Sequence, residues 1–304
     1  MSCFAFDLCA AEVDSFTDRD ARLKDSKVNL NRLVNTYFTD AARRANVSKS
    51  CDMKTIRREI LGKHNRWTWS RLENELYQNV FFDQRLTSID NSIYGDWEIF
   101  ALRLAGLAPL MRIGDIYIGT DKLSHFFHVG LDLFERVHVR GWKLQDVLDW
   151  NRDSEESYFG LWITGIFSYA DLAANYDGIT FWERVANTNL PLGVKPYFEC
   201  HEGKWSRIGR FDIDDYVNPA WDEANNCNLF RNTEMTTKVI ERISAIEKVR
   251  GEPLQCPISK TLCSAMIKRY AQVASQVISP VCFAPERTAS AGVASRLQSV
   301  IRNK

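Results

Sequence analysis

Apolar residues recur at helical spacing along most of this chain. Leu30, Val34 and Tyr37 show the pattern, which predicts an amphipathic helix over 28–45. We expect further helices at 53–61, 70–78, 100–111 (ending near Pro109 or Gly114), 144 to about 156, 234–250 and 258–277. The fold class is therefore mainly α, or α+β, with a compact helical body around a central helix and one small antiparallel β-hairpin.

The central helix is expected to begin after Thr120 as N-cap, to run to about Val139 and to stop at Gly141. Its surface is mostly apolar, which is typical of a helix surrounded by others. Five polar residues fall within roughly 80° of one another on a helical wheel. They are Asp121, His125, His128, Asp132 and Glu135. This polar stripe predicts either a cleft or a solvated face with charge pairing.

The segment after the next helix combines acids with glycines. Residues 158–167 carry Gly160 and Gly165 among aromatic and β-branched residues, which predicts a strand or hairpin. Ser168 should cap the following helix together with Asp171, and Asp177-Gly178 should end that helix.

Glu155 and Glu156 end the helix that precedes this hairpin. A carboxyl group backed by Tyr158, Phe159 and Trp162 would be desolvated, which would raise its pKa and make it a general acid. One of the two glutamates should instead face solvent, because adjacent helical residues point about 100° apart. We assign the acid to Glu156.

Glu156, the segment SYFGLWITGIFS and the helix from Tyr169 resemble the core of lysozyme-like muramidases and lytic transglycosylases. The resemblance covers about a tenth of the chain. It implies a glycoside hydrolase acting on peptidoglycan, with Glu156 as general acid and Asp171 or Asp121 as second carboxylate. His125, Ser168 and Tyr169 would line the cleft. The spacing to Asp171 departs from the shorter one of phage-type lysozymes.

The whole chain resembles an uncharacterised family of secreted bacterial proteins. The segments DKLSHFFHVG, GIFSYADLAANYDG and FDIDDYVNPAWDEANNC carry this likeness, which implies no particular activity. The DKxxHF piece is also similar to a motif of VanZ-like membrane proteins.

The loop-rich region 191–230 gathers aromatic and acidic residues. Trp205 and Trp221 would form a carbohydrate-binding wall, or the loop would be buried against the central helix and pinned by Cys200 and Cys227. Asp212, Asp214 and Glu223 occupy positions 1, 3 and 12 of an EF-hand-like loop. Val217 stands where that loop needs glycine, which disfavours calcium.

The cysteines indicate an oxidising compartment. No CxxC pair is present, and setting aside Cys3 and Cys9 leaves six of the eight cysteines as disulfide partners, with about fifteen pairings open. Residues 1–12 look like a signal-peptide remnant or an extension. Secreted or periplasmic localisation follows from these two features.

Charge and motifs narrow the function classes. Lys plus Arg number 39, as do Asp plus Glu, so nothing indicates nucleic acid. The best apolar run, 159–174, contains Thr164, Ser168 and Asp171, so no transmembrane segment is expected. Nucleotide-binding and serine-hydrolase motifs are absent from the sequence. We expect a single domain over 13–283, holding the site region 118–178, the loop 191–230 and C-terminal helices 234–283, and a polar tail over 284–304.

Three functions stay open at this point. The first is a peptidoglycan-acting glycoside hydrolase, without a cofactor, whose oligomeric state the sequence does not indicate. The second is a metal-dependent hydrolase that uses Asp121, His125 and His128. The third is a non-enzymatic cell-envelope protein in which the polar stripe pairs with basic residues such as Lys122 or Arg140.

Overall fold

The computed structural model of the chain describes residues 12–61, 72, 75, 82–97, 102–103 and 106–284, apart from the side chains of Tyr158 and Phe159. The signal-like N-terminus, the polar tail and most of the expected helix at 70–78 lie outside the described residues.

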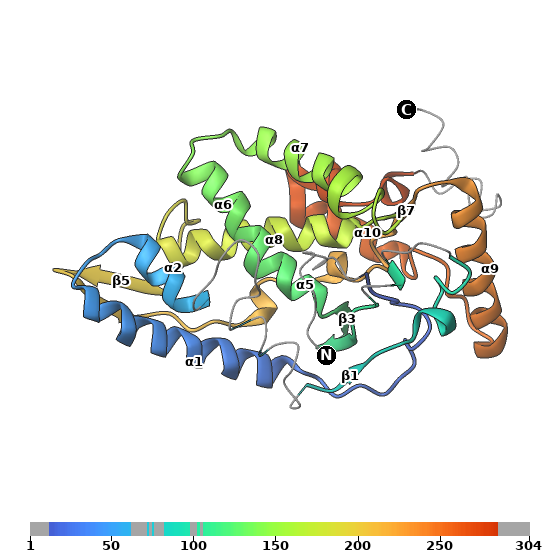
Figure 1. Ribbon diagram of the computed structural model, residues 1–304, viewed down its shortest axis with the longest axis horizontal. Coiled ribbons are helices and arrows are strands. Elements are labelled where there is room, and N and C mark those ends of the chain that lie inside the picture. The colour runs from blue at the N-terminus through green and yellow to red at the C-terminus, as the bar shows by residue number, and fades with distance from the viewer. Residues whose placement is uncertain are drawn as a thin grey trace.

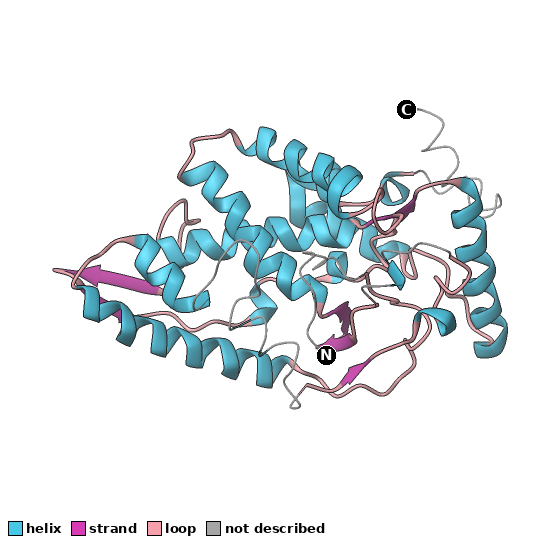
Figure 2. Cartoon of the chain, in the orientation of Figure 1, coloured by secondary structure: helices cyan, strands magenta, loops and turns pink. Residues whose placement is uncertain are grey.

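Helices dominate the described residues, which confirms a mainly helical chain with small antiparallel sheets (Figure 2). The helices are α1 Lys27–Ala45, α2 Met53–Leu61, α5 Asp121–Ser124, α6 Gly130–His138, α7 Leu144–Ser154, α8 Tyr169–Ala186, α9 Thr233–Arg250, α10 Lys260–Tyr270 and α11 Ala274–Val277. The predicted helices at 28–45, 53–61, 234–250 and most of 258–277 are therefore confirmed.

The strands are short and all pair antiparallel. A sheet in the order β1-β2-β3 joins Gln84–Arg85, Leu110–Ile113 and Ile116–Gly119. Two further pairs join β4 Ile166–Phe167 to β7 Leu229–Phe230 and β5 Phe198–His201 to β6 Lys204–Arg207.

Two expected elements differ from the structure. The apolar run at 100–111 does not continue as a helix, because Leu110–Ile113 pairs with Ile116–Gly119 around a tight turn in which Gly114 has φ of +58°. The hairpin at 158–167 does not form. Its only strand, β4, pairs instead with β7, which lies about sixty residues further along. Short apolar runs leave helix and strand ambiguous, and a distant partner cannot be read from spacing.

α8 lies at the centre of the hydrophobic core, and most of its residues are buried. The helices α5, α6 and α7 pack against it (Figure 1). The predicted stop at Asp177-Gly178 was wrong, because α8 continues to Ala186. A Cβ atom on Gly178 would lie 2.2 Å from the Phe126 carbonyl oxygen and 2.8 Å from Gly130 Cα. Gly178 is thus a packing position where the central helix crosses α8, rather than a helix end.

The central helix contains a π-helical turn, His125–Val129, between α5 and α6. A π turn inserts a residue and rotates everything after it relative to an ideal α-helix. The polar stripe therefore splits: Asp121 and His125 are buried, whereas Asp132 and Glu135 form ion pairs with Arg136 and Arg57. The expected continuous polar face of five residues does not exist.

Aromatic rings fill the core between the central helix, α1, α8 and the loop 191–230. Phe126 lies 5.3 Å from Trp221 and 5.0 Å from Phe181, measured between ring centroids, and Phe38 contacts Phe181 and Phe211. The alternative of a loop buried against the central helix is therefore the one that the structure adopts.

All six cysteines expected to form disulfides do so. The bonds are Cys51–Cys200, Cys227–Cys256 and Cys263–Cys282. Cys51–Cys200 ties β5 to the start of α2, and the other two bonds fix the C-terminal segments. These bonds fit an extracellular protein. No helix among the described residues has the length and apolar character that crossing a membrane demands.

Candidate functional site: a buried ionic cluster

Lys122 lies at the centre of a group of buried ionisable side chains. Its Nζ atom is 2.5 Å from Asp121 Oδ2, 2.5 Å from Asp171 Oδ1 and 2.6 Å from Glu223 Oε1. The Lys122 side chain is completely inaccessible. We call this group the buried cluster. Its members are Glu12, Asp121, Lys122, His125, Glu155, Asp171 and Glu223.

The turn between β3 and α5 places Asp121 and Lys122. Gly119 makes room for the Asp121 carboxylate, since a Cβ atom at position 119 would lie 2.0 Å from Asp121 Oδ1. Thr120 was expected to cap the helix, but its backbone is already helical and its hydroxyl makes no capping bond. A helical residue directs its side chain away from the first backbone N–H groups.

Ser168 contacts two of the carboxylates, and it caps α8 as predicted, although its backbone N–H bonds to Glu155 rather than to the Asp171 side chain. Its Oγ accepts a hydrogen bond of 3.2 Å from the Asp171 backbone N–H and donates one of 3.0 Å to Glu223 Oε1. Its backbone N–H donates to Glu155 Oε1 at 3.2 Å. The N-terminus of α8 thus presents donors to a cluster of acids, as helix N-termini favour.

His125 is held between an acid and an amide. Its Nε2 atom lies 3.1 Å from Asp171 Oδ2, and its Nδ1 atom lies 3.0 Å from Asn175 Oδ1. Asn175 in turn donates from Nδ2 to Asn151 Oδ1, which directs its oxygen toward the ring. Both ring nitrogens therefore face oxygen acceptors. Burial alone would lower the pKa of His125, but the Asp171 carboxylate outweighs it and raises the pKa to about 9.

Glu155, and not Glu156, faces the buried cluster. Burial, followed by the charge of Asp171, raises the pKa of Glu155 to about 8. A Cβ atom at position 160 would lie 2.7 Å from Glu155 Oε1, so Gly160 leaves space for this carboxyl group. Glu156 is half-buried and pairs with Arg152 at 3.5 Å.

Five carboxyl groups in this cluster share one lysine and one histidine. Burial raises the pKa of Glu223 to about 7, although Lys122 opposes the shift, and burial together with Asp171 raises that of Glu12 well above its usual range. Burial would also raise the pKa of Asp171, but the charges of His125 and Lys122 outweigh burial and hold this pKa below its ordinary value. At neutral pH the cluster therefore contains both protonated and ionised carboxyl groups.

Several buried oxygens of the cluster make no hydrogen bond within the described part of the chain. They include Asp121 Oδ1 and Glu12 Oε2. The other oxygen of Glu12 accepts a hydrogen bond of 2.6 Å from Thr164. Buried polar atoms without partners are uncommon, and they mark this cluster as strained or able to take a ligand.

The remaining sequence-predicted residues lie in the protein core. Trp221 is completely buried and donates from Nε1 to Asp177 Oδ2 at 2.7 Å, and Trp205 donates to the Ser50 carbonyl at 2.8 Å. Neither ring forms an open sugar-binding wall, because both side chains are buried. Tyr169 is buried, and its hydroxyl accepts a hydrogen bond from Arg152.

The EF-hand-like acids are separated in the structure. Asp212 accepts a hydrogen bond from Asn31, and Asp214 pairs with Lys27, whereas Glu223 belongs to the buried cluster. Sequence reasoning had assigned no chemical role to Glu12, and had considered Glu223 only as the last ligand of a disfavoured calcium loop. Lys122 could have indicated the buried cluster from the sequence, because a lysine beside an aspartate on an otherwise apolar helix needs a buried partner.

No protein-family model, curated protein or solved structure matches the chain. The geometry of the buried cluster is therefore what bears on the function of this protein.

Proposed function

We propose that this protein is a glycoside hydrolase in which Glu155 protonates the leaving oxygen and Asp171 is the ionised carboxylate of the pair. One observation carries the proposal: two buried acids at the start of α8, Glu155 held through its carboxyl group and Asp171 through its backbone N–H by Ser168, occupy surroundings that drive the protonation of their carboxyl groups in opposite directions. Cleavage of a glycosidic bond uses such a pair of carboxyl groups, in which the protonated one is the general acid and the ionised one is the second carboxylate.

Glu155 has the surroundings that a general acid requires. Its carboxyl group accepts a hydrogen bond from the Ser168 backbone N–H and lies against Gly160, and burial with the charge of Asp171 outweighs His125, Ser168 and Lys122, which favour its charged form. A carboxylic acid that keeps its proton at neutral pH can donate it to the glycosidic oxygen as the bond breaks.

Asp171 is suited to the opposite role. Lys122 and His125 hold it ionised and fix its position at the start of α8. A fixed carboxylate stabilises the positive charge that develops on the sugar ring during cleavage. His125 orients Asp171 and lines the site.

Peptidoglycan, or another carbohydrate polymer, is the substrate class that the resemblance to muramidases favours. An exposed aromatic ring near the acid supports it: Trp162 is 74% exposed and lies two residues after Gly160. Sugar rings stack on such faces. Glu155 itself is only 5% exposed, so catalysis requires the segment 160–164 to move away from the acid.

The test compares two adjacent glutamates. Glu155→Gln should reduce the release of soluble fragments from purified cell-wall sacculi by at least about a hundredfold, because a general acid contributes 10²–10⁴-fold. Glu156→Gln, the matched control, should retain activity. Equal activity of wild type and Glu155→Gln would refute this assignment, and a loss only in Glu156→Gln would return the role to Glu156.

A second candidate, a metal-dependent hydrolase, is favoured by one specific observation. Asp121, His125 and Asp171 each offer a ligand atom within 4.8 Å of the other two, and Asp121 Oδ1 is buried with no hydrogen-bond partner among the described residues. His128 does not belong to this set. Asp171 takes its place beside Asp121 and His125. Lys122 competes for the same carboxylates.

Elemental analysis of protein purified without chelators tests this candidate. About one equivalent of a transition metal, lost in Asp121→Asn, would support it. Less than about a tenth of an equivalent would end it.

A further inference from the structure

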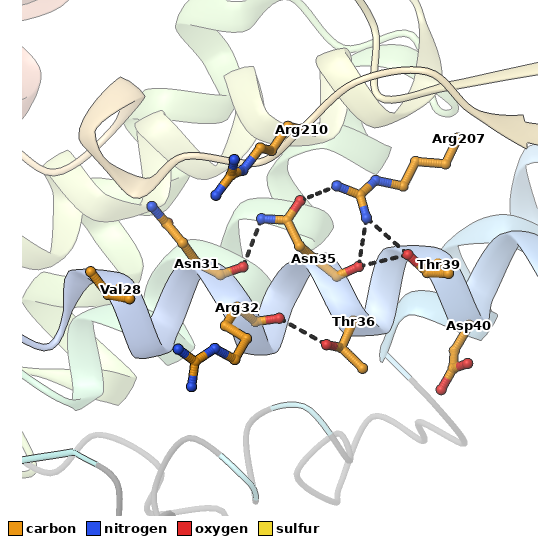
Figure 3. A pocket seen from close by; sticks show the side chains of 9 residues that line it. All are labelled: Val28, Asn31, Arg32, Asn35, Thr36, Thr39, Asp40, Arg207 and Arg210. Atoms are coloured by element: carbon orange, nitrogen blue, oxygen red, sulfur yellow. Dashed lines mark hydrogen bonds between the residues drawn. The ribbon is translucent and has the colours of Figure 1, made fainter.

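A polar groove lies between α1 and the segment 207–210, which begins at the last residue of β6 (Figure 3). Its volume is about 620 Å³, within the usual range for small-molecule sites. Three arginines contribute to its lining, namely Arg32 from α1 and Arg207 and Arg210 from the facing segment. Val28 is the only apolar side chain among the lining residues, so the groove suits a polar ligand.

Arg207 is fixed in place by neutral oxygens. Its Nη1 atom donates to the Asn35 carbonyl at 2.9 Å and to Thr39 Oγ1 at 2.8 Å, and its Nε donates to the Gly209 carbonyl at 3.0 Å. Nη2 donates to the Asn35 side-chain oxygen (Figure 3). None of these acceptors carries a negative charge, so the guanidinium is held rigidly without being neutralised.

Arg210 brings a second positive charge to the same groove. Burial and the charge of Arg210 both lower the pKa of Arg207, which reflects the repulsion between the two guanidinium groups. Within the described part of the chain, Arg210 and Arg32 form no ion pair with an acid. Like charges held together destabilise the protein unless an anion compensates them.

The nearby acids do not provide this compensation. Asp40, which lines one end of the groove, pairs with Arg43 at 3.4 Å and Arg44 at 3.7 Å. Asp212 accepts a hydrogen bond from Asn31 at the other end, but forms no contact with Arg207 or Arg210 among the described residues. As far as the described residues go, the groove therefore keeps an excess of positive charge.

From this arrangement we propose that the groove binds the phosphate group of a small polar molecule. Guanidinium groups match the oxygens of a phosphate in geometry and charge, and a preformed one loses little freedom on binding. Arg207 is the preformed anchor, with one Nη2 hydrogen left for the anion after its four hydrogen bonds, and the exposed Arg210 and Arg32 supply the other donors. The proposal is independent of the hydrolase assignment, since it shares no residue with the buried cluster.

Isothermal titration calorimetry with inorganic phosphate at low ionic strength tests the site. Saturable one-to-one binding is expected, and Arg210→Ala and Arg32→Ala should each weaken it at least about fivefold. Arg22→Ala removes an exposed arginine outside the groove and should leave the affinity unchanged. Circular dichroism checks that each variant is folded.

A second titration, with chloride at matched ionic strength, separates specific binding from general attraction. No saturable phosphate binding would overturn the proposal. So would equal affinities of wild type and Arg210→Ala, or equal weakening by Arg22→Ala and Arg210→Ala. Weaker or absent chloride binding is the expected outcome, and equally tight chloride binding would overturn the assignment to phosphate.

Discussion

At the residue scale, Lys122 is the side chain on which the buried cluster depends. Its ammonium contacts three carboxylates that are themselves almost inaccessible to water. Removing one partner of a buried ionic group leaves charges that neither water nor protein compensates. The carboxylates of the cluster would then have to bind protons, or the local structure would have to open.

Lys122→Met should therefore lower the free energy of unfolding by about 3–5 kcal/mol, as expected for breaking a buried ion pair. Urea denaturation followed by circular dichroism measures the change. Lys238→Met is the control, because Lys238 lies on the surface of α9 and pairs with Glu234 one turn away. Its effect should stay within about 0.5 kcal/mol. Similar losses in the two variants would contradict a central role for Lys122.

At the element scale, the crossing of the central helix over α8 positions His125 and Asp171 for contact. Gly130 and Gly178 allow this close approach, with the Gly178 Cβ position lying inside contact distance of the Phe126 carbonyl. Backbone atoms cannot move aside as a flexible side chain can. The crossing therefore tolerates no larger residue at position 178.

Gly178→Ala should destabilise the protein by about 1–3 kcal/mol through overpacking, despite the higher helix propensity of alanine. Thr180→Ala, two residues further along α8, is the control. It removes a half-buried hydroxyl that donates to the Asp177 carbonyl and should cost less. A stabilised Gly178→Ala protein in the same urea experiment would show that the helices can separate without penalty.

Local patterns predicted the long helices and the Ser168 cap, because periodicity and capping depend on neighbouring residues. They could not predict the π turn at His125–Val129, which shifts the register and divides the polar stripe. The pairing of Ile166–Phe167 with Leu229–Phe230 and the approach of Glu223 to Lys122 depend on contacts between distant segments. Choosing between Glu155 and Glu156 required knowing which side of the π-helical turn Glu155–Phe159, directly after α7, faces the start of α8.

At the scale of the whole molecule, the protons of the cluster make stability depend on pH. Burial raises the pKa of Glu155 to about 8 and that of Glu223 to about 7, from an ordinary value of 4.5. Between pH 4.5 and the raised pKa values, these two carboxyl groups keep protons in the folded protein that the unfolded chain has released. Stability should therefore fall as pH rises through this range.

Thermal unfolding between pH 5 and 8.5 at constant ionic strength measures this dependence. We expect the midpoint temperature to fall by several degrees across the range, as a few kcal/mol produces in a chain of this size. Glu155→Gln should flatten the decline, because its amide does not titrate. A midpoint that rises with pH would contradict the protonated state of the cluster.

The most direct measurement is a titration of the Glu155 side-chain carboxyl by carbon-13 NMR in glutamate-labelled protein. Comparison with Glu155→Gln assigns the signal. The buried position predicts a titration midpoint near 8. A midpoint close to the ordinary value of 4.5 would show that Glu155 is ionised at neutral pH, and would contradict its role as the general acid.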